Sequence, residues 1–188
     1  MNFCSECGRP VEQRIPGRDD RLRHVCPSCG TVHYQNPKMV VGTLPEWENK
    51  VLLCRRAIEP RYGLWTLPAG FMELGETVQQ GAARETLEEA HARVAVGPLY
   101  VLFNLPHIDQ VYLMFRARLQ DLQFRSGPES LEVRLFSEAE IPWGEIAFPV
   151  IAETLRLYFR DLATGSFGLR SGEIGPTTRI CGVCLRRW

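Results

Sequence analysis

Short apolar runs recur along the chain between residues 39 and 136, and charged or turn-forming residues separate them. Their content of valine, leucine and aromatic residues predicts β-strands rather than helices. A sheet of several strands is therefore expected to form the core of the protein. The predicted strands cover residues 39–44, 51–55, 94–96, 99–105, 111–119 and 131–136.

Two segments have helical periodicity. Residues 150–163 repeat apolar positions at helical spacing, with Pro149 in the first turn and Gly165 as a C-terminal cap. The other helix is predicted to begin at Thr77, because Thr77 and Gln80 have the spacing of a capping box. Strands and helices at these spacings predict an α/β fold, with a mixed sheet between helices.

The two ends of the chain differ from the middle in composition. The first part holds two C-x-x-C pairs, and the last is rich in glycine, serine, proline and arginine. We therefore predict a small domain over residues 1–35, an α/β domain over residues 36–163 and a flexible tail over residues 164–188. Cys181 and Cys184 form a further pair in the tail, for which a metal site shared with another chain and no role at all are both open.

The two N-terminal C-x-x-C pairs are each followed by glycine, and eighteen residues separate them. Four cysteines at this spacing are the ligand set of a tetrahedral zinc ribbon, with disulfides or bound iron as alternatives. So small a segment cannot bury a sufficient core, so the metal is expected to stabilise it. All four thiolates would be used, which makes the zinc structural. The expected ligands are Cys4, Cys7, Cys26 and Cys29.

Charge and hydropathy exclude several classes of function. The 22 basic and 22 acidic residues give a formal net charge of zero, so there is no electrostatic case for nucleic acid or an anionic membrane. No apolar run is long enough to span a bilayer, and the first residues do not resemble a signal peptide. We expect a cytoplasmic protein whose partner is a small molecule.

Three glutamates, Glu85, Glu88 and Glu89, fall within one narrow arc of the first predicted helix. Crowded carboxylates repel one another, and Mg²⁺ or Mn²⁺ bound by their oxygens would relieve that repulsion. Arg84 and Glu76 could pair and hold the cluster in place. A solvated acidic face is the alternative. The opposite, buried side is expected to consist of Ala83, Leu87 and Ala90.

Taken together, the glycine loop, the arginine and the glutamates resemble the Nudix box. The last glycine of that motif is replaced by His91, which would need a left-handed conformation to end the helix. The resemblance implies an α/β/α sandwich and metal-dependent hydrolysis of a diphosphate, with the Gly70 carbonyl and three glutamates as ligands. The matching positions are Gly70, Glu76, Arg84, Glu85, Glu88 and Glu89.

Segments outside the box give a narrower resemblance. The ribbon and residues 35–42, 62–70 and 127–132 resemble the zinc-ribbon Nudix hydrolases related to plant chloroplast FAD pyrophosphatase. These relatives imply cleavage of FAD to FMN and AMP, ADP-ribose as a further substrate, and by analogy a homodimer. A tract that marks NADH pyrophosphatases is absent between Arg93 and His107.

The resemblance also suggests roles outside the metal cluster. Arg84 and Glu132 are expected to be catalytic, with Glu132 or Glu129 supplying the general base if no box glutamate does. Glu129 and Trp65 are expected to contact substrate, although Trp65 would serve equally well in the core. Three functions remain as alternatives: a pyrophosphatase of NADH or another dinucleotide, a non-catalytic nucleotide sensor, and a nucleic-acid-binding ribbon protein. Further aromatic side chains that could stack on a substrate are Tyr100, Phe103 and Tyr112.

Overall fold

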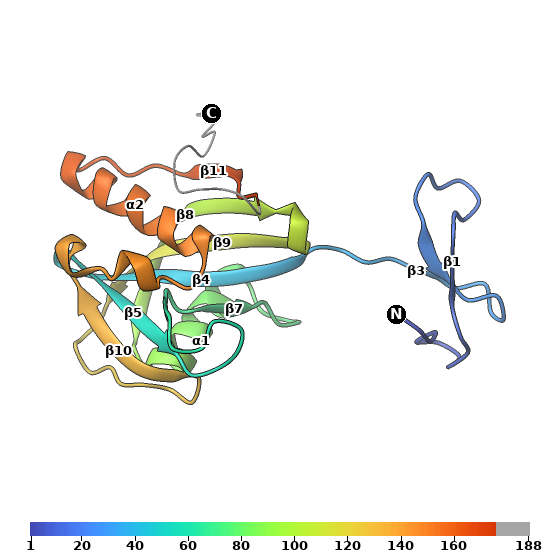
Figure 1. Cartoon of the computed structure of the whole chain (residues 1–188), viewed down its shortest axis with the longest axis horizontal. Coiled ribbons are helices and arrows are strands. Elements are labelled where there is room, and N and C mark those ends of the chain that lie inside the picture. The colour runs from blue at the N-terminus through green and yellow to red at the C-terminus, as the bar shows by residue number, and fades with distance from the viewer. Residues whose placement is uncertain (176–188) are drawn as a thin grey trace. The chain divides into compact units, whose positions relative to one another are not determined.

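A computed structural model describes residues 1–175 of the chain. These residues divide into two compact units, Met1–Pro37 and the residues from Lys38 onward (Figure 1). Cys181 and Cys184 lie outside the described residues. In the described part, no helix is both long and apolar enough to cross a membrane.

The first unit is a three-stranded antiparallel sheet in the order β1-β2-β3. A charged stretch lies between the two cysteine pairs and forms the hairpin that joins β1 to β2. Because the strands are so short, they bury few side chains, and this unit contributes little to a hydrophobic core. Its strands are β1 (Glu12–Arg14), β2 (Arg23–Val25) and β3 (Val32–His33).

The second unit is built on a mixed sheet in the order β10-β5-β4-β9-β8-β11, with β6 paired to β5 and β7 paired to β4. The pairs β4–β9 and β8–β11 are parallel, and the other pairs are antiparallel. The strands are β4 (Lys38–Trp47), β5 (Lys50–Arg56), β6 (Trp65–Thr66), β7 (Ala69–Phe71), β8 (Val94–Leu105), β9 (Gln110–Leu119), β10 (Ser130–Phe136) and β11 (Arg170–Glu173).

Two α-helices cover opposite faces of this sheet (Figure 1). Helix α2 (Pro149–Thr164) packs on the larger apolar cluster, which includes side chains of β4, β5, β8 and β9. Helix α1 (Val78–Ala90) covers two smaller clusters on the other face. The expected sandwich, with a mixed sheet between helices, is therefore confirmed. Three 3₁₀ turns complete the unit: Pro106–Ile108, Glu138–Glu140 and Trp143–Glu145.

The helix ends follow the predicted capping residues. The Thr77 hydroxyl accepts from the Gln80 N–H, and the Gln80 side chain accepts from the Thr77 N–H, so the capping box is complete. His91 ends α1 in the left-handed region with φ 47°, and Gly165 ends α2 in the same way with φ 67°. Both C-terminal caps that the sequence predicts are confirmed.

The left-handed His91 leads to a stability prediction. A side chain is strained in this region, whereas glycine adopts it freely. We expect His91→Gly to leave the free energy of unfolding unchanged or to raise it by up to about 1 kcal/mol. Urea unfolding of the variant and the parent protein measures this difference. A clear loss of stability would show that the imidazole makes a contact worth more than the strain.

The expected flexible tail is wrong for residues 164–175. Strand β11 pairs in parallel with β8, and the Arg170 guanidinium donates to both oxygens of the buried Asp161 carboxylate, at 2.7 and 2.9 Å. The ring centre of Phe167 lies 3.5 Å from the Arg116 guanidinium carbon. The prediction rested on the glycine and serine content of this segment, and it did not consider Phe167 and Arg170, whose side chains anchor the segment.

The expected buried side of α1 also needs correction. Ala90 is buried as expected, but Leu87 is 49% exposed, and Ala82, Thr86 and Glu89 are buried with Ala90. The Thr86 hydroxyl lies 2.6 Å from the hydroxyl of Thr43 on β4, so a polar contact fastens the helix to the sheet. The helix is rotated relative to the expectation, and the rotation takes one of the three glutamates into the interior.

Candidate functional site

The glycine loop is placed by the sheet. Strand β7 pairs with β4 and carries Gly70, and the chain then turns through Gly75 into α1. A Cβ on residue 70 would collide with the carboxylate of Glu85, so no other residue fits there without a shift. The backbone of Gly70 is thus held directly against the first glutamate of the cluster.

An arginine organises the carboxylates. Arg84 donates to Glu76 through Nε and Nη2, at 3.0 and 2.8 Å, and through Nη1 to Glu85 at 2.8 Å and Glu88 at 3.1 Å. The Glu73 N–H also donates to Glu76, at 2.7 Å. The Arg84 guanidinium is the main reason that the pKa of Glu76 falls to about 2. The predicted pairing of Arg84 with Glu76 is confirmed.

The pKa values of Glu85 and Glu89 shift in the opposite direction to that of Glu76. Glu89 is only 7% exposed, and burial together with the charge of Glu85 raises its pKa to about 8. Burial also raises the pKa of Glu85, against the bonds from Arg84. The charge of Glu129 raises the pKa of both, and that of Arg56 lowers the pKa of Glu89. Like charges this close together, one of them buried without an ion pair, favour a bound cation.

This donor set fits a hard divalent cation. Within residues 1–175, Glu89 forms no ion pair and Glu85 pairs with Arg84 alone, while the backbone of Gly70 lies against the Glu85 carboxylate. Glu88 is turned outward, with its side chain 59% exposed. Within residues 1–175 the three glutamates do not bring their oxygens within 4.8 Å of one another, so Glu88 would turn inward to share an ion. Oxygen-only ligands of this kind suit Mg²⁺ or Mn²⁺.

A loop between β9 and β10 closes the end of α1. The N–H groups of Arg125 and Gly127 donate to the carbonyls of Ala90 and Glu89, both at 2.9 Å. A Cβ on Gly127 would overlap the Glu88 carbonyl, so the close approach requires glycine. This loop brings Glu129 to the carboxylates, although 40 positions separate Glu129 from Glu89 in the sequence.

The expected catalytic position of Glu132 is not supported. Glu132 lies on β10, and its carboxylate is 4.0 Å from the Arg55 guanidinium on the neighbouring strand. By contrast, Glu129 lies near enough to raise the pKa of two box glutamates. Glu129 precedes β10, and a β-bulge between Ser130 and Glu132 shifts the strand register between the two acids.

The expected aromatic contacts with substrate are also not supported. Trp65 is 6% exposed, and its ring packs edge-on against Phe136 with 4.8 Å between centres. Tyr100, Phe103 and Tyr112 are buried in the same apolar cluster under α2. These rings form the core because they lie on strand faces that α2 covers.

The sequence alone did not single out two residues that lie near the carboxylates. Phe71 directly follows Gly70 and is 48% exposed, with the Lys38 ammonium 4.9 Å from its ring centre. Arg56 ends β5 and acts on the pKa of Glu89. The sequence feature that could have identified Arg56 is its position: it is a charged residue at the end of an apolar strand that precedes the box.

The first unit holds a second candidate metal site. The four cysteine sulfurs lie within 4.8 Å of one another. Cys4 and Cys29 are 3.7 Å apart, and Cys7 and Cys26 are 3.5 Å apart. Four sulfurs placed tetrahedrally at about 2.3 Å from zinc would be about 3.8 Å apart, so the observed spacing fits this metal.

The two cysteine turns have matching backbones. The Gly8 N–H donates to the Cys4 carbonyl and the Gly30 N–H to the Cys26 carbonyl, both at 2.9 Å, and both glycines have positive φ. His33 adds a neighbour on one side, because its Nε2 lies 3.3 Å from the Cys4 sulfur. The fold thus presents four thiols to one point with no open position for substrate, which is typical of a structural site.

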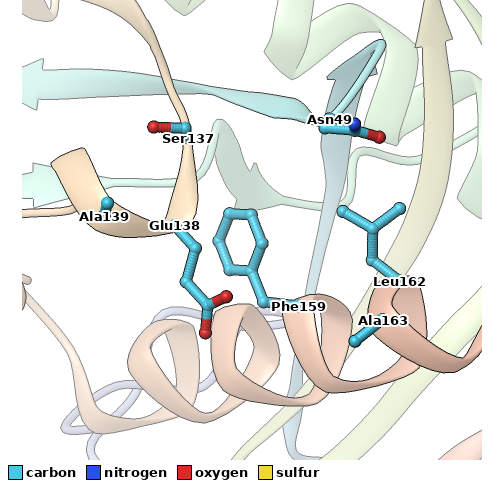
Figure 2. Close-up of a pocket in the computed structure, with 7 residues that line it drawn as sticks. All are labelled: Asn49, Ser137, Glu138, Ala139, Phe159, Leu162 and Ala163. Carbon is cyan, nitrogen blue, oxygen red and sulfur yellow. The ribbon is translucent and has the colours of Figure 1, made fainter.

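A separate hollow of about 580 Å³ lies beside Asn49, in the turn that precedes β5 (Figure 2). No residue of the glycine loop or of α1 lines it, and its walls come from the β4–β5 turn, the 3₁₀ turn Glu138–Glu140 and the end of α2. The carboxylates are therefore not part of it. The lining residues are Asn49, Ser137, Glu138, Ala139, Phe159, Leu162 and Ala163.

Comparison with protein families matches both units. Residues 37–155 match the profile described as the NUDIX domain, and residues 2–35 match the zinc-ribbon profile described as Nudix N-terminal. The crystal structure of a NUDIX hydrolase from Nitrosomonas europaea is 59% identical, covers 93% of this chain and 99% of its own, and superposes with a TM-score of 0.91.

Two curated relatives resemble parts of the chain. The mitochondrial NAD(P)H pyrophosphatase NUDT13 of Mus musculus is 35% identical over 92 residues, which are 49% of this chain and 25% of the relative. The ADP-ribose pyrophosphatase of Methanocaldococcus jannaschii is 29% identical over 113 residues, 58% of this chain and 67% of the relative. The chain thus spans a quarter of the length of the first relative and two thirds of the second.

Proposed function

Because the chain belongs to the Nudix family, we propose that it hydrolyses the diphosphate bond of a nucleoside diphosphate derivative with the help of Mg²⁺ or Mn²⁺. The observation that carries this proposal is the buried Glu89, which forms no ion pair within residues 1–175, on the same helix as Glu85, whose carboxylate lies against Gly70. An acidic surface made only for solubility would not place Glu89 in the interior.

The bound cation would offset charge on the phosphate oxygens and activate water for attack. Around it, Arg84 sets the orientation of the glutamates, since its nitrogens bond Glu76, Glu85 and Glu88 together. We assign the general base to Glu129 rather than Glu132, because the charge of Glu129 acts on Glu85 and Glu89, whereas Glu132 faces Arg55. A general base must lie within hydrogen-bond distance of the water from which it takes a proton.

For the substrate, the relatives favour the alternative over FAD. One is named for NAD(P)H and the other for ADP-ribose, and both compounds contain adenosine diphosphate joined to a ribose. We therefore propose that this shared ADP-ribose unit is recognised. FAD, which the sequence favoured as substrate, carries an open-chain ribitol in place of that ribose. We therefore propose that FAD is a poorer substrate than ADP-ribose or NADH.

A substrate panel tests this order. We expect kcat/KM for ADP-ribose or NADH to exceed that for FAD by at least about tenfold, which corresponds to about 1.4 kcal/mol of transition-state binding. The assay measures the rate at which each compound forms its products at saturating Mg²⁺. A parallel series uses Mn²⁺. The diphosphate chemistry would stand but the ribose assignment would fail if FAD ranked first.

A further inference from the structure

Arg56 lies beside the carboxylates, and the roles proposed above do not use it. It is the last residue of β5 and pairs in register with Ser130, the first residue of β10. The next residue, Ala57, donates its N–H to the Glu129 carbonyl at 2.8 Å. The end of β5 is therefore joined directly to the loop that carries the proposed base.

The Arg56 guanidinium is held from two sides. Its Nε donates to the Pro60 carbonyl at 2.9 Å, and its central carbon lies 5.2 Å from the ring centre of Phe148. Within residues 1–175, its two terminal nitrogens have no hydrogen bond or ion pair with a protein group. A guanidinium fixed through Nε and by a ring face keeps its terminal N–H groups oriented and available for a ligand.

The charge of Arg56 acts on the site. It lowers the pKa of Glu89 and of Tyr112, which agrees with the backbone pairing of β5 to the loop that carries Glu129. Neighbouring arginines are already engaged: Arg84 bonds three glutamates, and Arg55 donates to a loop carbonyl and faces Glu132. Arg56 is thus a cation at the site whose hydrogen-bonding capacity is largely unused.

We propose that Arg56 binds the phosphate oxygens of the substrate diphosphate through its terminal nitrogens, in addition to the cation that Glu85 and Glu89 would hold. This assignment rests on the proposed diphosphate function. A planar guanidinium matches two phosphate oxygens at once, which fixes the orientation of the group as well as adding attraction. Arg56 therefore contributes mainly to substrate binding.

Binding of an analogue that cannot be cleaved tests this role apart from catalysis. We use α,β-methylene-ADP, in which carbon replaces the bridging oxygen, and titrate it calorimetrically in the presence of Mg²⁺. We expect Arg56→Ala to raise Kd by at least about tenfold, as loss of a charge-assisted hydrogen bond does. The Kd of Arg56→Lys should lie between those of the parent and of Arg56→Ala, because lysine keeps the charge but lacks the planar guanidinium.

Arg55→Ala is the matched control, because it removes the same charge one residue away, and its Kd should stay within about threefold of the parent. The assignment is overturned if Arg56→Ala binds as tightly as the parent, if Arg55→Ala is equally impaired, or if the parent does not bind the analogue. Thermal unfolding checks the fold, and if Arg56→Ala does not fold, Arg56→Lys decides alone. If the parent binds the analogue but cleaves no diphosphate in the panel, the proposed function fails while the binding role of Arg56 stands.

Discussion

Glu88→Gln and Glu89→Gln should each reduce hydrolysis by about a hundredfold or more, the size of effect seen when one charge-stabilising group is removed from an active site. Both changes keep the shape of the side chain and remove a carboxylate that the proposed cation needs. The measurement is kcat/KM at saturating Mg²⁺. Glu138→Gln is the control, since it neutralises an exposed glutamate of another segment and should retain parent activity.

Stability separates this effect from misfolding. With a folded-state pKa of about 8, against an ordinary value of 4.5, Glu89 keeps a proton in the folded protein that the unfolded chain releases. Without added Mg²⁺, the parent should therefore lose stability as pH rises from about 4.5 to 8, and Glu89→Gln should lose less. Near-parent activity in both glutamine variants would end the assignment of the metal cluster.

Removing one zinc ligand should abolish the order of the first unit. We expect one zinc per chain by elemental analysis of the parent protein and none in Cys26→Ser. Cys26 and Cys4 are buried, and the strands β1–β3 are too short to supply a core in place of the metal. Zinc binding supplies about 10–16 kcal/mol in small zinc-finger peptides, so its loss exceeds what so small a unit can compensate.

Limited proteolysis reports the result by position. Cleavage of Cys26→Ser should concentrate within Met1–Pro37, while the second unit resists as in the parent, because the two units form separate compact bodies. Cys54→Ala is the control, since Cys54 is buried in the second unit and should leave the zinc content at one per chain. A parent protein without zinc, but with a resistant first unit, would contradict the structural role of the metal.

Features that depend on neighbours in sequence were predictable. The capping box at Thr77, the left-handed end at His91 and the two cysteine turns all arise from backbone geometry within a few residues. The arc that holds Glu85 and Glu88 follows from the helical repeat alone. Local spacing thus identified the two candidate metal sites and the α/β class before any contact was known.

Contacts between distant segments were not predictable in this way. The sequence could not tell that the loop at Gly127 closes the end of α1, that Glu129 rather than Glu132 reaches the carboxylates, or that Phe167 and Arg170 dock the C-terminal segment. In each case the partner is far along the chain, and the residue type alone fits a surface loop equally well.

By itself, then, the sequence determined which side chains share a helix face and which thiols converge, because helices and tight turns repeat with fixed geometry. Only the tertiary structure decided which of those groups are buried. Glu89 lies in the interior because α1 is rotated towards the sheet and a loop covers its end, and Trp65 lies in the core because α2 covers its strand face. Burial depends on what packs above a residue, and that information is spread over the whole chain.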